Sequence, residues 1–282
     1  MTKHYLPIDL SPTGNVQSYG NSGAIIKVDG NTVLKMAGKA TQKKRILTQA
    51  RWMQERGMSV CPKILSILDN AYVMERLNEV DWSVADPVLV MKSVKIILQD
   101  HVWNIPALTP QKWLAKFLTY VEKRAVTAKL PPEMIAAILD RVRQLNDIKG
   151  ELEWCEIHGD PTLDNVMMRP HEYGDGCELV LTDALPYKEG KMPALKIVDL
   201  GKMLQSAWGY EQALGTKNMV PYDSVLQREM EMTILDGESP TTVQGAFIMA
   251  LVHYVRLMPY QRGKKSRQAM FQILEREVLR VR

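Results

Sequence analysis

The sequence predicts an α+β fold in two parts, a small antiparallel β-sheet with one helix followed by a larger, mainly helical region. The chain has 282 residues, of which 46% are hydrophobic and 24% charged, so it can bury a full core. Short β-type runs separated by turn residues fill the first seventy-odd positions. Beyond them, long helical patterns alternate with loops. We therefore divide the chain at this change of pattern, into 1–76 and 77–282.

Residues 1–76 are expected to form three strands, a helix and two further strands. The predicted strands are, in chain order, 16–19, 23–28, 32–36, 63–68 and 71–74. Asp29-Gly30-Asn31 predicts a tight hairpin between the second and third of them. Apolar or small residues at helical spacing predict a helix over 41–56, which ends at Gly57.

The region from residue 77 onward is expected to be mainly helical. The predicted helices are 84–101, 110–127, 132–148, 201–214, 223–235, 241–257 and 265–279. Between the third and fourth of them, 154–198 is rich in turns and contains two short predicted strands, 178–182 and 195–198. No apolar run approaches the roughly 20 residues that cross a bilayer, and the start lacks the apolar centre of a signal peptide. We therefore expect a cytoplasmic protein with no membrane partner.

The cysteines and the charge distribution argue against several kinds of site. Cys61, Cys155 and Cys177 are odd in number and show no metal-binding spacing, which predicts reduced thiols. The net charge of +4 is mild, although basic residues crowd positions 262–282. That tail could attract a polyanion, or it could be the solvated face of the last helix. Because it lacks interleaved aromatic residues, we do not expect it to bind nucleic acid.

The segment 156–168 carries the strongest chemical signal. It has an apolar approach, a polar loop with Asp160 and Asn165 five residues apart, and an apolar exit. Such a loop places a carboxylate and an amide oxygen in one pocket. Phosphoryl transfer needs a carboxylate to orient and deprotonate the acceptor hydroxyl, and hard oxygen ligands to hold Mg²⁺ on the phosphates. Asp160 suits the first task and Asn165 the second.

The pattern HGDxxxxN, formed by His158, Gly159, Asp160 and Asn165, resembles the catalytic loop of the aminoglycoside phosphotransferase and choline kinase superfamily. The resemblance implies a bilobal protein-kinase-like fold, and the two parts predicted above agree with its small N-lobe and larger helical C-lobe. It also implies that Asp160 is the catalytic base, that Asn165 is a metal ligand and that His158 supports the loop backbone. The implied cofactors are ATP and Mg²⁺.

The resemblance implies a second metal ligand after this loop, for which two aspartates compete. Asp183 follows the predicted strand 178–182 and precedes Asp199 by a gap close to the usual spacing of the family. Asp199 begins an Asp-Leu-Gly triplet similar to that of protein kinases, but it leads straight into a helical pattern. In small-molecule kinases such an element chiefly braces the lobe. We therefore favour Asp183 as the metal ligand and keep Asp199 as the second choice.

The N-lobe contains the residues that the resemblance assigns to the nucleotide. Backbone groups at Gly20, Ser22 and Gly23 could approach phosphates, although an ordinary hairpin turn fits the same residues equally well. Lys35 on the third predicted strand matches the lysine that contacts the α and β phosphates. The end of the last N-lobe strand resembles the hinge that binds adenine, and its residues are Met74, Glu75 and Leu77.

One residue of the family pattern is missing. The helix after Lys35 should carry a glutamate that pairs with it, but the centre of this helix offers only Gln49, and Glu55 lies near its end. Either Gln49 hydrogen-bonds the lysine without neutralising it, or Glu55 reaches it from a shifted helix. The departure keeps open a weak kinase, or a pseudokinase that binds nucleotide or a partner without turnover.

Taken with the resemblance, the sequence predicts an ATP- and Mg²⁺-dependent phosphotransferase that acts on a hydroxyl group of a small molecule. The acceptor classes are an aminoglycoside, a choline-like amine, a sugar or a nucleoside. Candidate pocket residues between the C-lobe helices are Trp208, Tyr210, Glu211 and Tyr254, although residues of this kind belong more often to a core than to a pocket. A protein kinase or nucleotidyl transferase on the same scaffold is a further alternative. The choice between ATP and GTP and the oligomeric state are left open.

Overall fold

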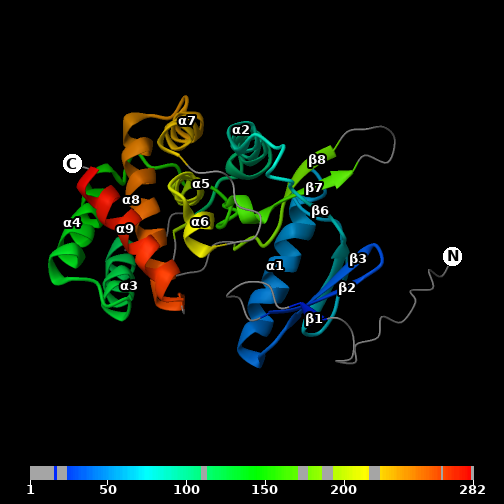
Figure 1. Cartoon of the computed structure of the whole chain (residues 1–282). Helices are drawn as coiled ribbons and strands as arrows, with labels where there is room; N and C mark the ends of the chain where they lie inside the picture. Colours follow the sequence, from blue (N-terminus) through cyan, green and yellow to red (C-terminus); the bar gives the residue numbers. More distant parts are fainter. Residues whose placement is uncertain are drawn as a thin grey trace.

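A computed structural model of the chain describes residues 16–17, 24–108, 113–170, 177–185, 193–215, 223–261 and 263–280. Within these residues, a small antiparallel sheet with one helix is followed by a larger helical region (Figure 1). This arrangement confirms the predicted bilobal α+β class. The division of the chain into 1–76 and 77–282 stays a prediction.

The N-lobe sheet is antiparallel throughout, with the strand order β1-β2-β3-β5-β4. Its strands are β1 (Val16–Gln17), β2 (Ala24–Asp29), β3 (Thr32–Ala37), β4 (Ile64–Ile67) and β5 (Ala71–Glu75). The predicted hairpin joins β2 to β3, and Gly30 takes the positive φ of 51° that favours glycine in such a turn. All five predicted strands are therefore present, with small differences at their ends.

Helix α1 (Lys43–Arg56) packs on this sheet, which Figure 1 shows beside it. It buries Ile46, Ala50 and Met53 on one face, at the three- and four-residue spacing that predicted it. Gly57 ends the helix with a φ of 77°, a conformation that residues with a side chain rarely adopt. The helix is therefore fixed to the sheet that carries Lys35.

The larger region is mainly helical, as predicted. Its helices are α2 (Pro87–Leu98), α3 (Trp113–Thr127), α4 (Pro132–Ile148), α5 (Lys196–Ala207), α6 (Tyr210–Leu214), α7 (Ser224–Leu235), α8 (Pro240–Leu257) and α9 (Lys264–Arg280). A π-helical turn, η2 (Gln99–Trp103), extends α2. Short 3-10 turns are η1 (Ala40–Gln42), η3 (Leu163–Asn165) and η4 (Met258–Tyr260).

A second antiparallel sheet, in the order β6-β7-β8, contains the strand that follows the HGD loop, our name for residues 158–165. Its strands are β6 (Asn78–Glu79), β7 (Val166–Pro170) and β8 (Cys177–Leu181). β6 follows the predicted hinge, β7 begins at the end of the HGD loop, and β8 leads to Asp183. The sequence predicted β8 only, because β6 is two residues long and β7 reads as the apolar end of the motif.

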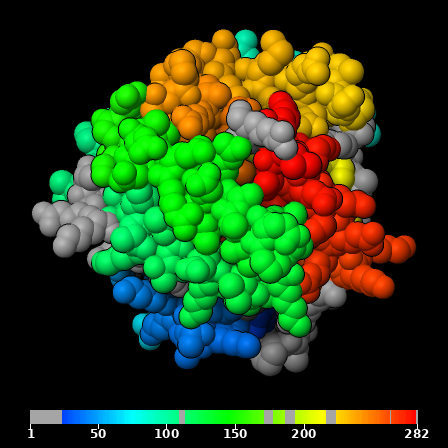
Figure 2. Space-filling model, turned by 90° about the vertical axis from the view of Figure 1, so that its left-hand side faces the viewer, coloured from blue at the N-terminus to red at the C-terminus, as the bar shows by residue number. Residues whose placement is uncertain are grey.

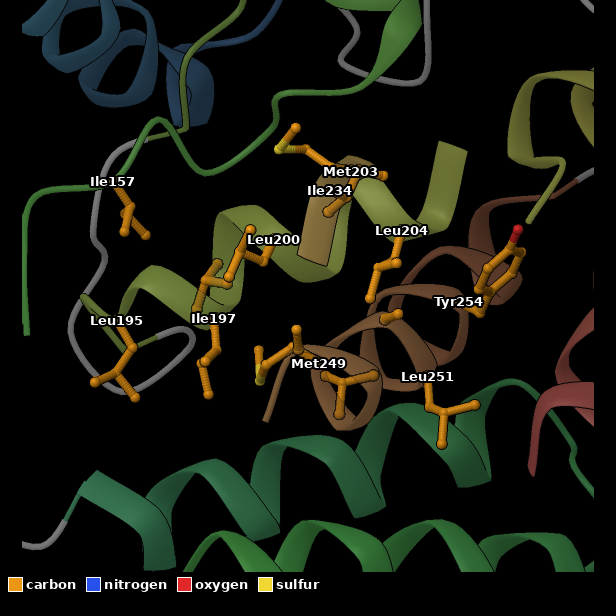
Figure 3. Packing of buried hydrophobic residues seen from close by; sticks show 14 of the residues in the cluster. Ile157, Leu195, Ile197, Leu200, Met203, Leu204, Ile234, Met249, Leu251 and Tyr254 are labelled. Atoms are coloured by element: carbon orange, nitrogen blue, oxygen red, sulfur yellow. The ribbon is translucent and has the colours of Figure 1, made fainter. Parts of the chain in front are cut away.

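The core of the C-lobe lies between α5 and α8, where Figure 3 shows the side chains at close range. Buried residues from α5, α7 and α8 fill it, among them Leu200, Met203, Leu204, Ile234, Met249 and Leu251. Gly201 permits the close approach of the two helices. A Cβ atom at this position would lie 2.6 Å from the Cβ of Met249 and 2.9 Å from the nitrogen of Ala250. Helices α5 and α8 are therefore closely packed against each other.

The strand predicted over 195–198 is wrong. Leu195 forms only an isolated bridge with Trp154, and α5 begins at Lys196. The buried residues of α5 run from Ile197 to Ala207 without interruption, so this part of the helix has no face exposed to solvent. A short apolar run that is buried on all sides has no periodicity that separates a strand from a helix. The segment 201–214, predicted as a single helix, instead belongs to two helices, α5 and α6, with Gly209 between them.

The face of the C-lobe formed by α3, α4 and α9 is turned to the viewer in Figure 2. Helix α9 buries Met270 and Leu274, and two of its arginines pair with acids, Arg276 with Glu277 and Arg280 with Glu231. This packing favours the interpretation of the basic C-terminal region as the outer face of the last helix. None of the described helices combines the length and the apolar character that a membrane span requires.

Candidate active site

Asp199, in the first turn of α5, fixes the backbone of the HGD loop. Its carboxylate accepts hydrogen bonds from the backbone N–H of His158 (2.9 Å), the backbone N–H of Gly159 (2.6 Å) and Nε1 of Trp103 (3.0 Å). The residue has no exposed area. Burial raises the pKa of Asp199 to about 6, although the three N–H donors act in the opposite direction. At neutral pH the carboxylate is therefore ionised and satisfied by donors of the protein itself.

His158 is buried and neutral. Burial lowers the pKa of its ring to about 4. Its Nδ1 accepts a hydrogen bond from the backbone N–H of Asp160 (3.3 Å), and its ring stands edge-on to Trp52 with 5.5 Å between the ring centroids. These contacts suit a residue that supports the loop backbone.

Gly159 is the position where the HGD loop touches the chain after Asp183. Its φ is 81°, and a Cβ atom here would lie 1.9 Å from the carbonyl oxygen of Leu185. In return, the backbone N–H of Leu185 donates to the carbonyl oxygen of His158 (2.7 Å). Only glycine therefore fits at this position of the motif, because any side chain would collide with backbone.

The side chain of Asn165 binds the backbone of Asp160. Nδ2 of Asn165 donates to the carbonyl oxygen of Asp160 (2.8 Å) and to Oγ1 of Thr162 (3.2 Å). Its Oδ1 receives no hydrogen bond from the described residues, so this oxygen is available as a ligand. The side chain of Asp160 is 22% exposed, and its Oδ1 lies 2.8 Å from Nζ of Lys202.

Asp183 lies on the loop after β8, with a φ of 57°. Its side chain is 39% exposed and forms an ion pair with the buried Lys35 of β3. Its neighbours bind the HGD loop at both ends: the N–H of Thr182 donates to the carbonyl oxygen of Asn165 (2.8 Å), and Leu185 to that of His158. The loop that carries Asp183 is thus held directly against the loop that carries Asp160.

Both expectations for the missing glutamate are wrong, since Lys35 pairs with neither Gln49 nor Glu55 in the part of the chain that the structure describes. The buried Gln49 instead donates through Nε2 to the carbonyl oxygen of Ala184 (2.7 Å), and its Oε1 accepts from the hydroxyl of Tyr72 (3.3 Å). Helix α1 therefore holds the backbone next to Asp183. Asp183 itself supplies the acid for Lys35.

The donor atoms at this site fit Mg²⁺. Asp183 and Asn165 offer one carboxylate and one amide oxygen, and Mg²⁺ usually takes one or two protein oxygens while phosphates and water complete its shell. In the described residues, no three or more His, Cys, Asp and Glu side chains gather to hold a metal by themselves. Asp199 fits less well, because three N–H donors already occupy its buried carboxylate.

The predicted hinge residues end β5, but the carboxylate of Glu75 is already engaged. Its Oε1 accepts from Nη2 of Arg169 (2.6 Å) and from the backbone N–H of Lys63 (2.7 Å). The backbone N–H of Glu75 is engaged as well, because it donates to the carbonyl oxygen of Lys63 (3.0 Å). Met74 is partly buried and Leu77 is buried, and their contact with adenine stays a prediction. Gly20, Ser22 and Gly23 lie outside the described residues.

Two of the four candidate pocket residues belong to the core. Trp208 and Tyr254 have no exposed area, and their polar atoms bind Glu231 (2.7 Å) and the carbonyl oxygen of Gln205 (3.0 Å). Glu211 is buried and accepts from Oγ of Ser206 (2.6 Å). Tyr210 is partly exposed, and its ring centroid lies 5.9 Å from Nζ of Lys202, next to Asp160. It is the one of the four that the structure brings to the edge of the site.

Sequence reasoning missed Lys202, which contacts Asp160 directly. The signal was present, because Lys202 lies three residues after Asp199 in a helical pattern and so on the same helix face. The strand predicted over 195–198 concealed this relation, since it placed Asp199 after a strand.

The comparisons with known proteins agree with this geometry. The model of the phosphotransferase enzyme family matches residues 24–178. A protein from Thermobifida fusca assigned as a fructosamine-3-kinase is similar in structure, with a TM-score of 0.58 and 15% identity over 94% of this chain and 92% of that one. The ADP-bound aminoglycoside phosphotransferase APH(2'')-Ib gives a TM-score of 0.54, with 12% identity over 93% and 90%.

An ethanolamine kinase from Plasmodium vivax gives a TM-score of 0.53, with 10% identity over 93% of this chain and 81% of that one. At these identities the structural likeness shows the fold alone, which is that of a kinase. A search of curated proteins found no match.

Proposed function

This chain belongs to the phosphotransferase enzyme family, and we propose that it transfers the γ-phosphoryl group of ATP to a hydroxyl group of a small molecule. One observation carries the proposal: Thr182 and Leu185, on either side of Asp183, are hydrogen-bonded to Asn165 and His158. These bonds hold a partly exposed carboxylate beside the HGD loop. A base and a phosphate-binding group must be close together for phosphoryl transfer.

In the proposed reaction, Asp160 orients the acceptor hydroxyl and takes its proton. The acceptor oxygen forms a bond to the γ-phosphorus, the bond between that phosphorus and the β–γ bridging oxygen breaks, and ADP leaves. Lys35 provides positive charge for the phosphates. Asn165 and Asp183 would hold Mg²⁺, which neutralises charge on the phosphates when bound.

The acceptor is proposed to be a small molecule, because the structurally similar proteins are named for aminoglycosides, ethanolamine and fructosamine. Hydroxyl compounds that carry an amine are therefore the first to test. Sugars and nucleosides without an amine form the second group. No contact among the described residues favours one member of these groups over another.

Two measurements test the proposal. The first is the melting temperature of the protein with ATP or GTP, each with and without Mg²⁺. The second is ADP or GDP release with aminoglycosides, choline-like amines, fructosamines, sugars and nucleosides, with Asp160→Asn as the control. We expect a Mg²⁺-dependent rise in melting temperature, and release with one acceptor class that falls by orders of magnitude in Asp160→Asn.

The alternative outcomes are equally clear. Stabilisation by nucleotide without release for any acceptor would favour a pseudokinase, an alternative motivated by the lack of a glutamate at the centre of α1. If neither nucleotide shifts the melting temperature and no release is seen, the proposed reaction is wrong.

A further inference from the structure

Three side chains on one face of α5 hold the HGD loop. They lie at positions i, i+3 and i+7 of the helix and are Asp199, Lys202 and Ser206. Asp199 binds the first two backbone N–H groups of the loop. Lys202 binds the side chain of Asp160, and Oγ of Ser206 accepts from the backbone N–H of Leu163 (3.2 Å). Successive turns of one rigid helix therefore contact successive parts of the loop.

Of these three, only Lys202 contacts the proposed base. Its side chain is 4% exposed, and its Nζ lies 2.8 Å from Oδ1 of Asp160 and 3.0 Å from Oε1 of Gln205. The hydroxyl of Tyr254 in turn binds the carbonyl oxygen of Gln205. The ammonium group is thus held at a fixed point by α5 and by the core.

The two carboxylate oxygens of Asp160 have different surroundings. Oδ1 is bound by Lys202, whereas Oδ2 receives no hydrogen bond from the residues that the structure describes. The side chain is 22% exposed in spite of its buried partner. The carboxylate of Asp160 therefore has one oxygen that is bound by Lys202 and one that is open to a ligand.

We propose that Lys202 is a positioning residue for the proposed phosphoryl transfer: it fixes Oδ1 of Asp160 so that Oδ2 faces the acceptor hydroxyl. The inference rests on the proposed function of Asp160 as the base. A charge-assisted hydrogen bond in a buried setting restricts rotation of the carboxylate. A base whose reacting oxygen is already oriented loses less entropy on reaching the transition state. The segment Asp199-Leu200-Gly201-Lys202 thus contains Asp199, which binds the loop backbone, and Lys202, which orients the carboxylate of Asp160.

Three variants test this role. Lys202→Met removes the charge and keeps most of the volume, while Lys202→Ala leaves a space of about the size of propylammonium. Lys196→Met is the matched control, because Lys196 lies on the same helix and is also paired with acids, Glu153 and Glu238, but does not contact the HGD loop. It shows what the loss of a structural ion pair does by itself.

For each variant, we would measure kcat, the KM for Mg²⁺-ATP and the melting temperature. ADP release is followed with the acceptor that gives the wild type its highest rate, or with water if no acceptor exceeds it. Lys202→Met should lower kcat roughly 10- to 100-fold, with the KM for ATP within about twofold of the wild type. Added propylammonium should restore part of the rate of Lys202→Ala but none of Lys202→Met. Lys196→Met should keep the wild-type kcat.

The inference is wrong if Lys202→Met keeps kcat within about twofold of the wild type. It is also wrong if Lys202→Met loses kcat together with a comparable loss of melting temperature and of nucleotide binding, and propylammonium restores nothing in Lys202→Ala. Failure of the proposed function looks different, because the wild type itself would then release no ADP, and the inference would fall with it.

Discussion

Asp183 and Asp199 are the two aspartates that compete as metal ligand in the sequence, and the tertiary structure gives them opposite surroundings. Asp183 lies on a loop, is 39% exposed and has Lys35 as its charged partner. Asp199 lies on a helix, has no exposed area and accepts three hydrogen bonds from N–H groups. Each is tied to the HGD loop, the first through the backbone of its neighbours and the second through its own carboxylate.

This contrast shows how the surroundings of an aspartate decide whether its carboxylate can bind a cation or only stabilises the protein structure. A carboxylate with free lone pairs and access to solvent can bind a cation, whereas one that is saturated by buried donors can only hold structure. The difference supports the proposal that Asp183 is the metal ligand. It also predicts that the same chemical change at the two positions has different consequences.

The largest expected effect is on activity, in Asp183→Asn. The amide oxygen can still accept a hydrogen bond from Lys35, but the buried ammonium loses its charged partner, so we expect the free energy of unfolding to fall by about 1 to 2 kcal/mol. The loss of the carboxylate charge should lower Mg²⁺-dependent ADP release roughly 1,000-fold. Steady-state rates over a range of Mg²⁺ concentrations, with urea unfolding of the same protein, measure both quantities. A rate close to that of the wild type would remove Asp183 from the proposed metal site.

Asp199→Asn should act in the reverse manner, chiefly on stability. The new NH₂ group replaces one acceptor oxygen and faces N–H donors, so at least one buried donor loses its partner. We expect the free energy of unfolding to fall by about 2 to 3 kcal/mol. Urea unfolding at pH 7 measures this, with Asp183→Asn as the matched control. If Asp199→Asn were stable but failed to bind Mg²⁺-ATP, while Asp183→Asn bound it normally, the two assignments would be exchanged.

Gln49→Glu tests the support for the Asp183 loop from α1. A family glutamate would stabilise Lys35, so the family pattern predicts a gain. In this structure, the new carboxylate would face the carbonyl oxygen of Ala184, to which Gln49 now donates. We therefore expect ADP release to fall by about 10-fold, which corresponds to the loss of one buried hydrogen bond. Gln54→Glu makes the same change on the exposed face of α1 and should have no effect. A faster Gln49→Glu enzyme would contradict this geometry.

The smallest effect is the pH dependence that Asp199 contributes. Its folded-state pKa is raised to about 6, above its ordinary value, so the folded protein binds the proton more tightly than the unfolded chain. This contribution is greatest in acid and is lost as pH rises through 6. The wild type should therefore gain about 1 kcal/mol relative to Asp199→Asn between pH 7 and pH 5. Urea unfolding of both proteins at the two pH values measures the difference, and a constant difference would contradict the raised pKa.

The local sequence pattern was sufficient to predict the strands of the N-lobe and the proximity of Asp160 and Asn165 in the HGD loop. The strands are short runs of β-type residues separated by glycine- and asparagine-containing turns, so their positions and ends are visible in the sequence. In the HGD loop, Asp160 and Asn165 are close in the chain and must be close in space. The helices of the C-lobe were visible for the same reason, since most of them have one apolar face.

The sequence by itself determined the class of fold, the motif and, apart from Lys202, the charged residues near the motif. Only the tertiary structure decided which distant groups meet: Lys35 with Asp183, Gln49 with Ala184, and Lys202 with Asp160. The physical reason is that these contacts depend on how α1 and α5 pack. Neither residue spacing nor propensity encodes the position of one element relative to another, whereas buried polar groups must find partners wherever the packing leaves them.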